Sequence, residues 1–154
     1  VGFLREAFSP QAGVFLAGMI PVTELRAAIP LGISLGLKPG EACFFAVLGN
    51  IVPIPILLVL LPKMMRWFSK GTWIGRRLDW WTVRTLERSD KVETYGAIGL
   101  VLFTAIPLPS TGAWSASLAA VIFRISPHRA FASIAVGVLI AGAVVTLLSA
   151  GLLL

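Results

Sequence analysis

The stretch AGVFLAGMIPVTELRAAIPLGISLGL, residues 12–37, consists of two apolar blocks, 12–22 and 27–37, on either side of a polar break. At about 1.5 Å per residue, each block makes a helix of about 16 Å, roughly half the thickness of a bilayer's hydrocarbon core. The break, Pro21-Val22-Thr23-Glu24-Leu25-Arg26, combines a proline with ionisable groups, which a continuous membrane helix does not easily accommodate. The pattern favours a re-entrant hairpin with its tip at mid-membrane, and a bent spanning helix is the alternative.

The composition of the chain is that of a membrane protein. Hydrophobic residues make up 57% of the 154 residues and charged residues only 13%, and the mean hydropathy is +0.91. Soluble domains carry roughly a quarter charged residues, so this chain has too little polar surface to cover a globule in water. The formal net charge is +6, but the basic residues gather in one loop between hydrophobic blocks. That placement favours contact with anionic lipid and argues against nucleic acid.

Two segments are long enough to cross a bilayer as helices. Residues 42–61 reach about 30 Å as a helix, which matches the hydrocarbon core. Residues 130–154 carry no charge and are longer still. Pro53 and Pro55 lie inside the first segment and predict a kink or a loosened turn there.

The second half of the chain repeats the plan of the first. Apolar blocks at 96–106 and 113–123 flank a second break, Pro107-Leu108-Pro109-Ser110-Thr111-Gly112, and the second span follows. Identical residues recur at near-constant offset. The pairs are Pro21 with Pro107, Ala27 with Ala113, Pro39 with Pro127, Ala42 with Ala130 and Gly49 with Gly137. Such matches arise easily in apolar sequence, so the shared order of blocks carries more weight than the identities.

The order of blocks predicts the topology. If each hairpin returns to its own side, the single span between them places the hairpins on opposite faces, which is the inverted repeat of many secondary transporters. The linker, residues 62–95, holds eight basic residues between Lys63 and Lys91, interleaved with tryptophan. We expect an amphipathic helix in the headgroup region on the cytoplasmic side; a helix that packs its tryptophans on protein is the alternative. The fold class predicted is therefore an all-α integral membrane domain over residues 1–154, with repeats at about 12–61 and 96–154.

Glu24 and Arg26 are the candidate functional residues of the first break. Ionisable groups at membrane depth are costly, so they usually face a cavity or each other. Desolvation disfavours a charged carboxyl unless Arg26 compensates it, which makes Glu24 a candidate proton carrier or cation ligand. The planar guanidinium of Arg26 suits a carboxylate or a phosphate. The alternative is a Glu24–Arg26 pair that only stabilises the hairpin.

The second break offers complementary groups for an anion. Ser110 and Thr111 supply hydroxyls, and Gly112 lets the backbone come close. The helix that begins near Ala113 points its N-terminal amides into the break, and these amides together with the helix dipole favour an anion. Trp114 either lines this site or packs against a neighbouring helix.

The remaining candidates are assigned to helix packing or discounted. Gly32 and Gly36 fit a small-residue face for close helix packing. Asn50 is expected to hydrogen-bond across helices within the first span, and Gly137, the counterpart of Gly49, belongs with the packing residues. The Gly32-Ile33-Ser34-Leu35-Gly36 match to a nucleophile elbow lies in an apolar helix, without the strand–turn–helix that the motif needs. We therefore predict no enzyme activity, no metal cluster and no cofactor.

Four motifs resemble the prokaryotic small multi-drug export protein family. They are Glu24-Leu25-Arg26-Ala27-Ala28-Ile29-Pro30-Leu31-Gly32, Leu48-Gly49-Asn50-Ile51-Val52-Pro53, Ala105-Ile106-Pro107-Leu108-Pro109-Ser110-Thr111-Gly112-Ala113-Trp114 and Gly137-Val138-Leu139-Ile140-Ala141-Gly142. The resemblance runs from about Phe15 to Gly151, and the family often has glycine where this chain has Ala27. It implies a multi-pass protein of the prokaryotic inner membrane, distantly related to the DedA/VTT superfamily, some of whose members move polyprenyl-phosphate or other lipids. The motif prolines Pro30, Pro107 and Pro109 are counted with the binding residues.

The sequence thus predicts a secondary transporter or lipid flippase, coupled to a proton or cation. The substrate, a small molecule or a lipid phosphate, is expected to be anionic and to bind between the two hairpin tips. Two hairpins and two spans are little material to seal a pathway, so we expect a homodimer among membrane lipids. The alternative is a structural or chaperone-like membrane protein that transports nothing.

Overall fold

The computed structural model describes residues 9–69, 90–107 and 111–153, and among these it contains helices and no β-strand. The helices are α2 (Pro10–Met19), α3 (Glu24–Ser34), α4 (Pro39–Ile51), α5 (Pro53–Ser69), α7 (Asp90–Ala105), α8 (Ala113–Ile122) and α9 (Pro127–Leu153). The predicted all-α class is confirmed. Most of the basic, tryptophan-rich linker, predicted as an amphipathic helix, lies outside the described residues.

Two helical stretches are long and apolar enough to cross a membrane. They cover Pro39–Trp67, with 29 residues, and Pro127–Gly151, with 25 residues. At about 1.5 Å per residue both exceed the roughly 30 Å of the hydrocarbon core. The first is interrupted at Val52, between α4 and α5, where Pro53 and Pro55 have no N–H to give to the preceding turn. This is the loosened turn that the two prolines predict.

The shorter helices follow the apolar blocks with one difference. The helices α2, α3 and α8 begin and end within a few residues of the predicted blocks, whereas α7 begins at Asp90, six residues before the apolar block 96–106. The reason is that the first residues of α7 are mostly polar, and hydropathy alone therefore assigns them to the linker.

Two helices end in the same way, at equivalent points of the two halves. Gly36 has φ +92° and follows α3, and the N–H of Leu37 donates to the carbonyl of Gly32 at 3.0 Å. Arg124 has φ +54° and follows α8, and the N–H of Ile125 donates to the carbonyl of Ala120 at 2.9 Å. This is the left-handed helix end with a six-to-one hydrogen bond. Gly36 thus terminates α3, and a Cβ there would meet nothing within 4 Å, so it does not form part of a helix contact.

Glycines let the helices approach closely. A Cβ on Gly49 of α4 would overlap the backbone carbonyl of Phe15 in α2, and one on Gly137 of α9 would lie 2.9 Å from the carbonyl oxygen of Val101 in α7. The positions 15 and 101 differ by the same offset as Pro21 and Pro107. Gly32 makes a similar approach, with a Cβ position 2.8 Å from the Cβ of Ala42. Small residues at helix crossings allow this backbone proximity.

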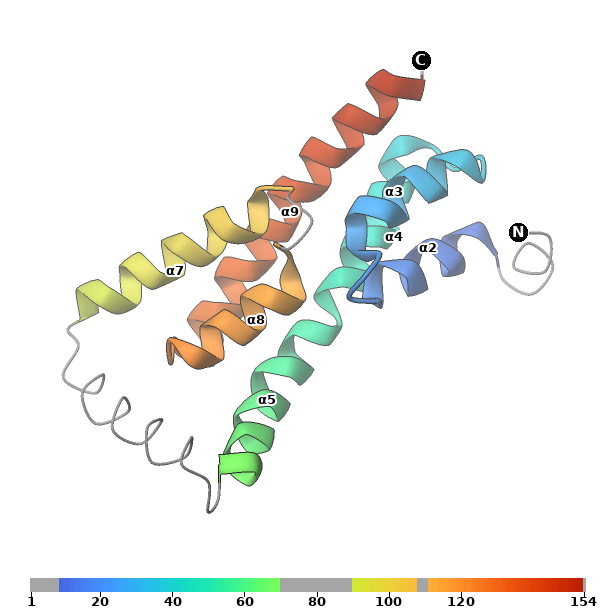
Figure 1. Cartoon of the computed structure of the whole chain (residues 1–154). Helices are drawn as coiled ribbons and strands as arrows, with labels where there is room; N and C mark the ends of the chain where they lie inside the picture. The colour runs from blue at the N-terminus through green and yellow to red at the C-terminus, as the bar shows by residue number, and fades with distance from the viewer. Residues whose placement is uncertain (1–8, 70–89, 108–110, 154) are drawn as a thin grey trace.

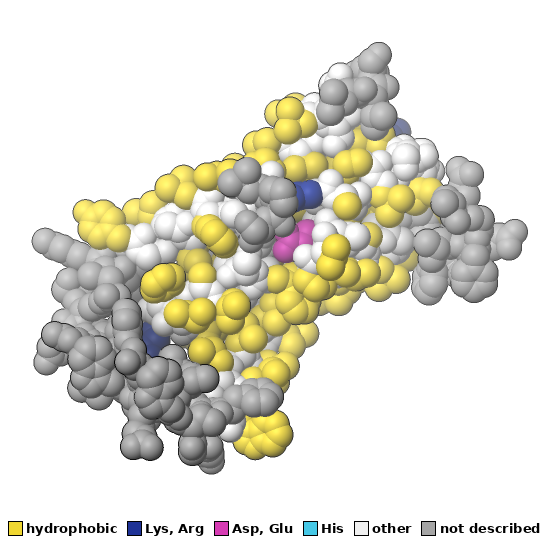
Figure 2. All heavy atoms as spheres, in the orientation of Figure 1, with side chains coloured by type: hydrophobic (Ala, Val, Ile, Leu, Met, Phe, Trp, Pro, Cys, Tyr) yellow, Lys and Arg dark blue, Asp and Glu magenta, His cyan; other side chains and the backbone are white. Residues whose placement is uncertain are grey.

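The helices are arranged as two pairs on two long helices (Figure 1). The pair α2–α3 packs on α4, the pair α7–α8 packs on α9, and α4 contacts α9 between them. Many of the side chains buried between these helices are small, including Ala28, Ala42, Ala46, Ala116 and Ala130 at 0% exposure. Hydrophobic side chains cover much of the outer face (Figure 2), as expected of a surface in contact with lipid.

Candidate functional site

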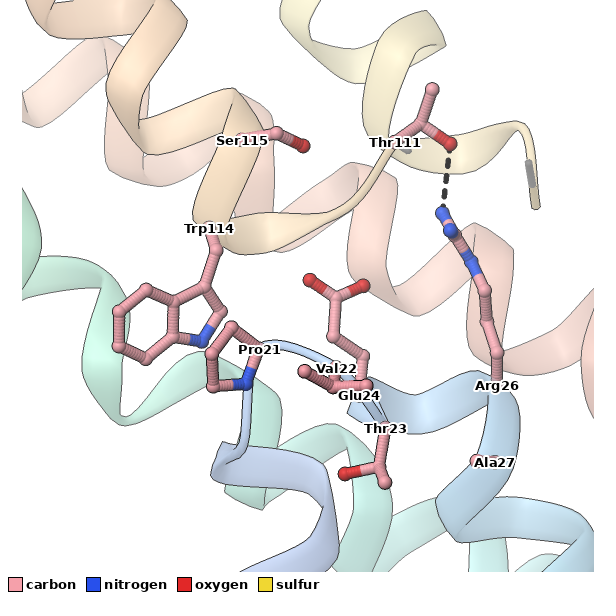
Figure 3. Close-up of a pocket in the computed structure, with 9 residues that line it drawn as sticks. All are labelled: Pro21, Val22, Thr23, Glu24, Arg26, Ala27, Thr111, Trp114 and Ser115. Carbon is pink, nitrogen blue, oxygen red and sulfur yellow. Dashed lines mark hydrogen bonds between the residues drawn. The ribbon is translucent and has the colours of Figure 1, made fainter. Parts of the chain in front are cut away.

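The turn between α2 and α3 meets the start of α8, and a cavity of about 490 Å³ lies between them. Its lining comes from both halves of the chain (Figure 3). The lining residues are Pro21, Val22, Thr23, Glu24, Arg26, Ala27, Thr111, Trp114 and Ser115. On the face shown in Figure 2, acidic and basic side chains lie next to each other and are surrounded mainly by uncharged and hydrophobic ones. The cavity is therefore a polar site within an apolar protein.

Glu24 is the first residue of α3 and is buried, with 7% of its surface exposed. Its backbone is left-handed, with φ +43°, a conformation that costs energy for a residue with a side chain and often occurs at functional sites. Its carboxyl points toward the start of α8 (Figure 3). There it packs against Gly112, where a Cβ would overlap both carboxyl oxygens, and it accepts a hydrogen bond from the backbone N–H of Trp114.

The contact of Glu24 with α8 is a helix cap supplied from another helix. Trp114 is the second residue of α8, and the first N–H groups of a helix have no acceptor within that helix. No side chain of residue 112 can cap α8, because that residue is glycine. A carboxylate at this end also interacts favourably with the helix dipole. The carboxylate of Glu24 therefore occupies the anion-binding end of α8.

Arg26 connects α3 to the segment between α7 and α8. Its Nη2 donates to Thr111 Oγ1 at 2.8 Å and to the carbonyl oxygen of Ile106 at 3.3 Å. The hydroxyl of Thr111 donates in turn to the same carbonyl at 2.6 Å. Hydrogen bonds from a charged donor are stronger than neutral ones. The guanidinium thus closes a small network at the end of α7 while it still lines the cavity.

Glu24 and Arg26 make their hydrogen bonds with different groups of the second half. In Figure 3 the guanidinium reaches Thr111, while the carboxyl lies on the side of Trp114. The two charges interact electrostatically, but the contacts described for them join one helical pair to the other. In place of the pair within a single hairpin that was the alternative interpretation, the two side chains connect both halves of the chain.

Trp114 lines the cavity and also fixes the two halves together. Its indole N–H donates to the carbonyl oxygen of Met19, the last residue of α2, at 3.2 Å. Nearby hydroxyls are engaged in local hydrogen bonds: Ser115 Oγ donates to the carbonyl of Gly112 at 3.3 Å, and Thr23 Oγ1 donates to the carbonyl of Ala17. These bonds hold the wall of the cavity in place. Both roles considered for Trp114 are thus present.

The structure brings together some of the predicted binding residues and separates others. Glu24, Arg26, Thr111 and Trp114 line one cavity, and Gly112 lies directly beneath the Glu24 carboxyl. The predicted prolines do not line it: Pro30 lies within α3, and Pro107 is exposed after the end of α7. Two further candidates, Pro109 and Ser110, lie outside the described residues.

Sequence reasoning missed Ser115 as a lining residue. Its position as the third residue of α8, directly after Trp114 and close to the second break, was a usable signal. Thr23, also in the lining, belongs to the first break but received no role. The apolar residues Pro21, Val22 and Ala27 complete the wall. Only the tertiary structure shows which of their faces the cavity contacts.

Asn50 departs from the role expected of it. It is 1% exposed in α4, and its Oδ1 has no hydrogen-bond partner among the described residues. The bond across helices that the sequence predicts is therefore not made by this oxygen within that part of the chain. In the same described ranges no group of three or more histidine, cysteine, aspartate or glutamate side chains is placed to hold a metal ion.

The comparisons with known proteins identify a family for this chain but no individual related protein. No curated protein and no solved structure matches the chain. A family described as "Putative small multi-drug export protein" matches residues 24–144, a range that includes both sides of the cavity. The family name describes an exporter, that is, a transporter-type protein and not an enzyme. A transporter-type family agrees with the two apolar helices of membrane-spanning length. The chain belongs to the small multi-drug export protein family of membrane proteins.

Proposed function

We propose that the protein is a secondary transporter of inverted-repeat design, which binds an anionic substrate in the cavity between the two helical pairs. The cavity itself carries this proposal, because one half of the chain supplies its two charged side chains and the other half supplies the α8 N-terminus. A site between repeats near the ends of short helices is the arrangement on which many secondary transporters rely.

Equivalent contacts in the two halves support the inverted repeat. The α2–α4 contact, in which Gly49 meets the carbonyl of Phe15, corresponds to the α7–α9 contact, in which Gly137 meets the carbonyl of Val101. The packing of α3 on α9 likewise corresponds to the packing of α8 on α5. A repeat in both sequence and contacts is expected when two copies of one unit form a pseudo-symmetric pair.

In this proposal the pairs α2–α3 and α7–α8 are re-entrant hairpins that enter from opposite faces of the prokaryotic inner membrane. Each helix of α2, α3 and α8 has 10 or 11 residues, about 15 Å by the rise of a helix, so a hairpin reaches roughly mid-membrane. The basic linker then lies in the cytoplasm. We further propose a homodimer, since two spans and two hairpins enclose little volume.

Arg26 is proposed to hold the substrate anion, and Glu24 to carry the coupling proton. The guanidinium lines the cavity, and its planar fork of N–H donors suits a carboxylate or a phosphate. Glu24 is a buried carboxyl in the same cavity wall, and when it takes up a proton the charge of Arg26 is balanced by the substrate anion. Substitution of Glu24 by glutamine should abolish proton-coupled movement and leave a folded protein; normal proton-coupled transport by this variant would refute the coupling role.

The first test measures ligand binding to the detergent-purified protein by thermal shift. The panel contains undecaprenyl phosphate, small carboxylate and phosphate anions, and cationic drugs. Wild type is compared with Arg26→Ala and with Arg129→Ala, a control that removes an exposed arginine outside the cavity. We expect an anion to stabilise wild type and the control but not Arg26→Ala. Stabilisation of all three, or by cationic drugs alone, would contradict an anion site at Arg26.

A second function, a structural membrane protein without transport, is favoured by one observation. Glu24 and Arg26 both contact the other half of the chain, as they would if they served only to fasten the two halves. The exchange of both residues, Glu24→Arg with Arg26→Glu, tests this. A protein that loses ligand binding yet keeps its fold has a binding site there, whereas loss of the fold itself would favour the structural role.

A further inference from the structure

The carboxyl of Glu24 already binds where an anionic substrate would bind. It lies on the α8 N-terminus, it is buried, and it accepts a hydrogen bond from the Trp114 amide. This position is an oxyanion site occupied by a side chain of the protein itself. The following inference rests on the proposed transport function and specifies how its site works.

We propose that Glu24 and the substrate oxyanion bind alternately at the start of α8, so that the anion enters the site only when Glu24 takes up a proton. The proton goes to a carboxyl oxygen of Glu24, the carboxyl becomes neutral and leaves the amides, and the anion takes its place. One proton and one monoanion are then carried together, and the net charge of the site does not change.

The charges of the site favour this exchange. Arg26 is the one cation that lines the cavity within the described ranges, and Glu24 is the one anion there, so the site is neutral while Glu24 is ionised. A second anion beside the ionised carboxylate would leave one uncompensated negative charge in surroundings of low dielectric. A protonated Glu24 removes this penalty, because Arg26 then pairs with the incoming anion.

The space around Glu24 also favours alternate binding. Its carboxyl contacts Gly112 so closely that not even a Cβ fits between them, so an oxyanion cannot enter beside it at this point. The left-handed backbone of Glu24, with φ +43°, costs energy that the contact with α8 offsets. Once the carboxyl is neutral and this contact is weakened, relaxation of the backbone would move the side chain away.

Few other ionisable groups are placed to take over the titration. On its own helix the other ionisable residue is Arg26, which interacts with Glu24 electrostatically. Within the described residues α2, α8 and the turn from Ile20 to Thr23 contain no titratable side chain. The described ionisable residues of the other elements packed on α3 are Lys38, Glu41 and Cys43 at the start of or within α4, and His128 and Arg129 at the start of α9. All of them are exposed except the thiol of Cys43, which is half-buried.

The site fits an amphiphilic monoanion with a compact oxyanion group. A carboxylate or a phosphodiester matches the position that the Glu24 carboxyl occupies, and both suit Arg26. The adjoining wall is partly apolar, formed by Pro21, Val22 and Ala27, so it suits a hydrocarbon part next to the charged group. The anion can be a soluble molecule or a lipid headgroup, and the experiment separates these two sources.

The experiment measures the affinity for two phosphodiesters whose charge is constant between pH 5 and pH 8. Dimethyl phosphate represents a soluble anion, and phosphatidylglycerol in nanodiscs represents a lipid headgroup. Wild type, Glu24→Gln and Glu41→Gln are compared at pH 5.5 and pH 7.5. Glu41 is an exposed glutamate outside the cavity, so its variant is the matched control.

We expect wild type and Glu41→Gln to bind more tightly at the lower pH, by up to about tenfold per pH unit for one coupled proton. Glu24→Gln should bind equally well at both pH values, and at pH 7.5 at least about tenfold more tightly than wild type, because a competing charge has been removed. This pattern with dimethyl phosphate, with phosphatidylglycerol or with both supports the exchange, and the phosphodiester that shows it identifies the source of the anion.

Weaker binding by Glu24→Gln, or an unchanged pH dependence, would overturn the exchange. If Arg26→Ala in that case still abolished binding, the proposed anion site would stand without it. No binding to any of the three proteins at either pH would overturn both proposals. A second measurement uses wild type alone: in weakly buffered solution at pH 7.5, addition of the anion should cause uptake of about one proton per anion bound, and binding without uptake would also contradict the exchange.

Discussion

Replacement of Gly112 by alanine should displace the Glu24 carboxyl from the start of α8. A Cβ built at Gly112 lies 2.5 Å from Cδ of Glu24 and overlaps both carboxyl oxygens. Carbon atoms in contact are about 3.5–4.0 Å apart, so the carboxyl must retreat by about 1 Å or more. The backbone of Gly112, with φ 162°, is extended and accepts alanine, so the effect is purely steric.

A displacement of this size breaks the hydrogen bond from the Trp114 amide, because such bonds weaken sharply beyond about 3.2 Å. Loss of a helix cap costs about 1 kcal/mol, and the weaker interaction with the helix dipole costs about 0.5 kcal/mol more. The free energy of unfolding should therefore fall by about 1.5 kcal/mol. For a chain of this size that lowers the Tm by about 3–6 °C.

The assay is thermal unfolding of the detergent-purified protein, combined in a double-mutant cycle with Glu24→Ala. In the Glu24→Ala background the new methyl group has no carboxyl to displace, so Gly112→Ala should change the Tm by less than about 1 °C. An equal loss of stability in both backgrounds would refute the reasoning, since the cost would then come from some other contact of Gly112.

Three further predictions concern the fold. Gly49→Ala should lower the free energy of unfolding by about 1–3 kcal/mol through overpacking against α2. Gly99→Ala, where a Cβ meets nothing within 4 Å, should be neutral or stabilising. Thermal unfolding compares the two variants, and equal effects would contradict the close approach of α4 to α2. Gly40 and His128 are equivalent exposed positions in the two halves. Single cysteines placed there should react with a membrane-impermeant maleimide from opposite sides of the membrane. Labelling of both from the same side would exclude an inverted repeat. Asn50→Leu should leave the Tm unchanged or raise it, because it removes a buried hydrogen-bond acceptor without a partner. A fall in Tm of more than about 4 °C would show that the Asn50 side chain makes a stabilising hydrogen bond.

Helices were predictable from the sequence because their signals are local. The lengths of the apolar blocks and the polar breaks between them locate the helices without reference to the rest of the chain. Gly36 was assigned to helix packing, whereas in the structure its left-handed backbone ends α3. Where the signal is not local the prediction was less accurate. The helix α7 begins earlier than its apolar block, since hydropathy does not mark a helix that continues through polar residues.

The candidate site was predictable as a set of residues but not as an arrangement. Ionisable groups in an apolar chain identify Glu24 and Arg26, and the second break identifies Thr111 and Trp114. Their pattern predicted a proton carrier and an anion-binding arginine in one hairpin, with a pair between them as the alternative, and an open helix terminus in the other. In the structure each charged group instead bonds to the opposite half, and the Glu24 carboxyl occupies the helix terminus.

The sequence by itself determined the composition, most of the helices, the two breaks and four of the nine residues that line the cavity, Glu24, Arg26, Thr111 and Trp114, because each follows from the local order of apolar, polar and special residues. The tertiary structure alone decided that Arg26 meets Thr111, 85 residues away, and that Glu24 packs on Gly112. Such contacts depend on how two separate helical pairs are oriented on α4 and α9. That orientation is set by the packing of many small side chains at once, and no local pattern in the sequence encodes it.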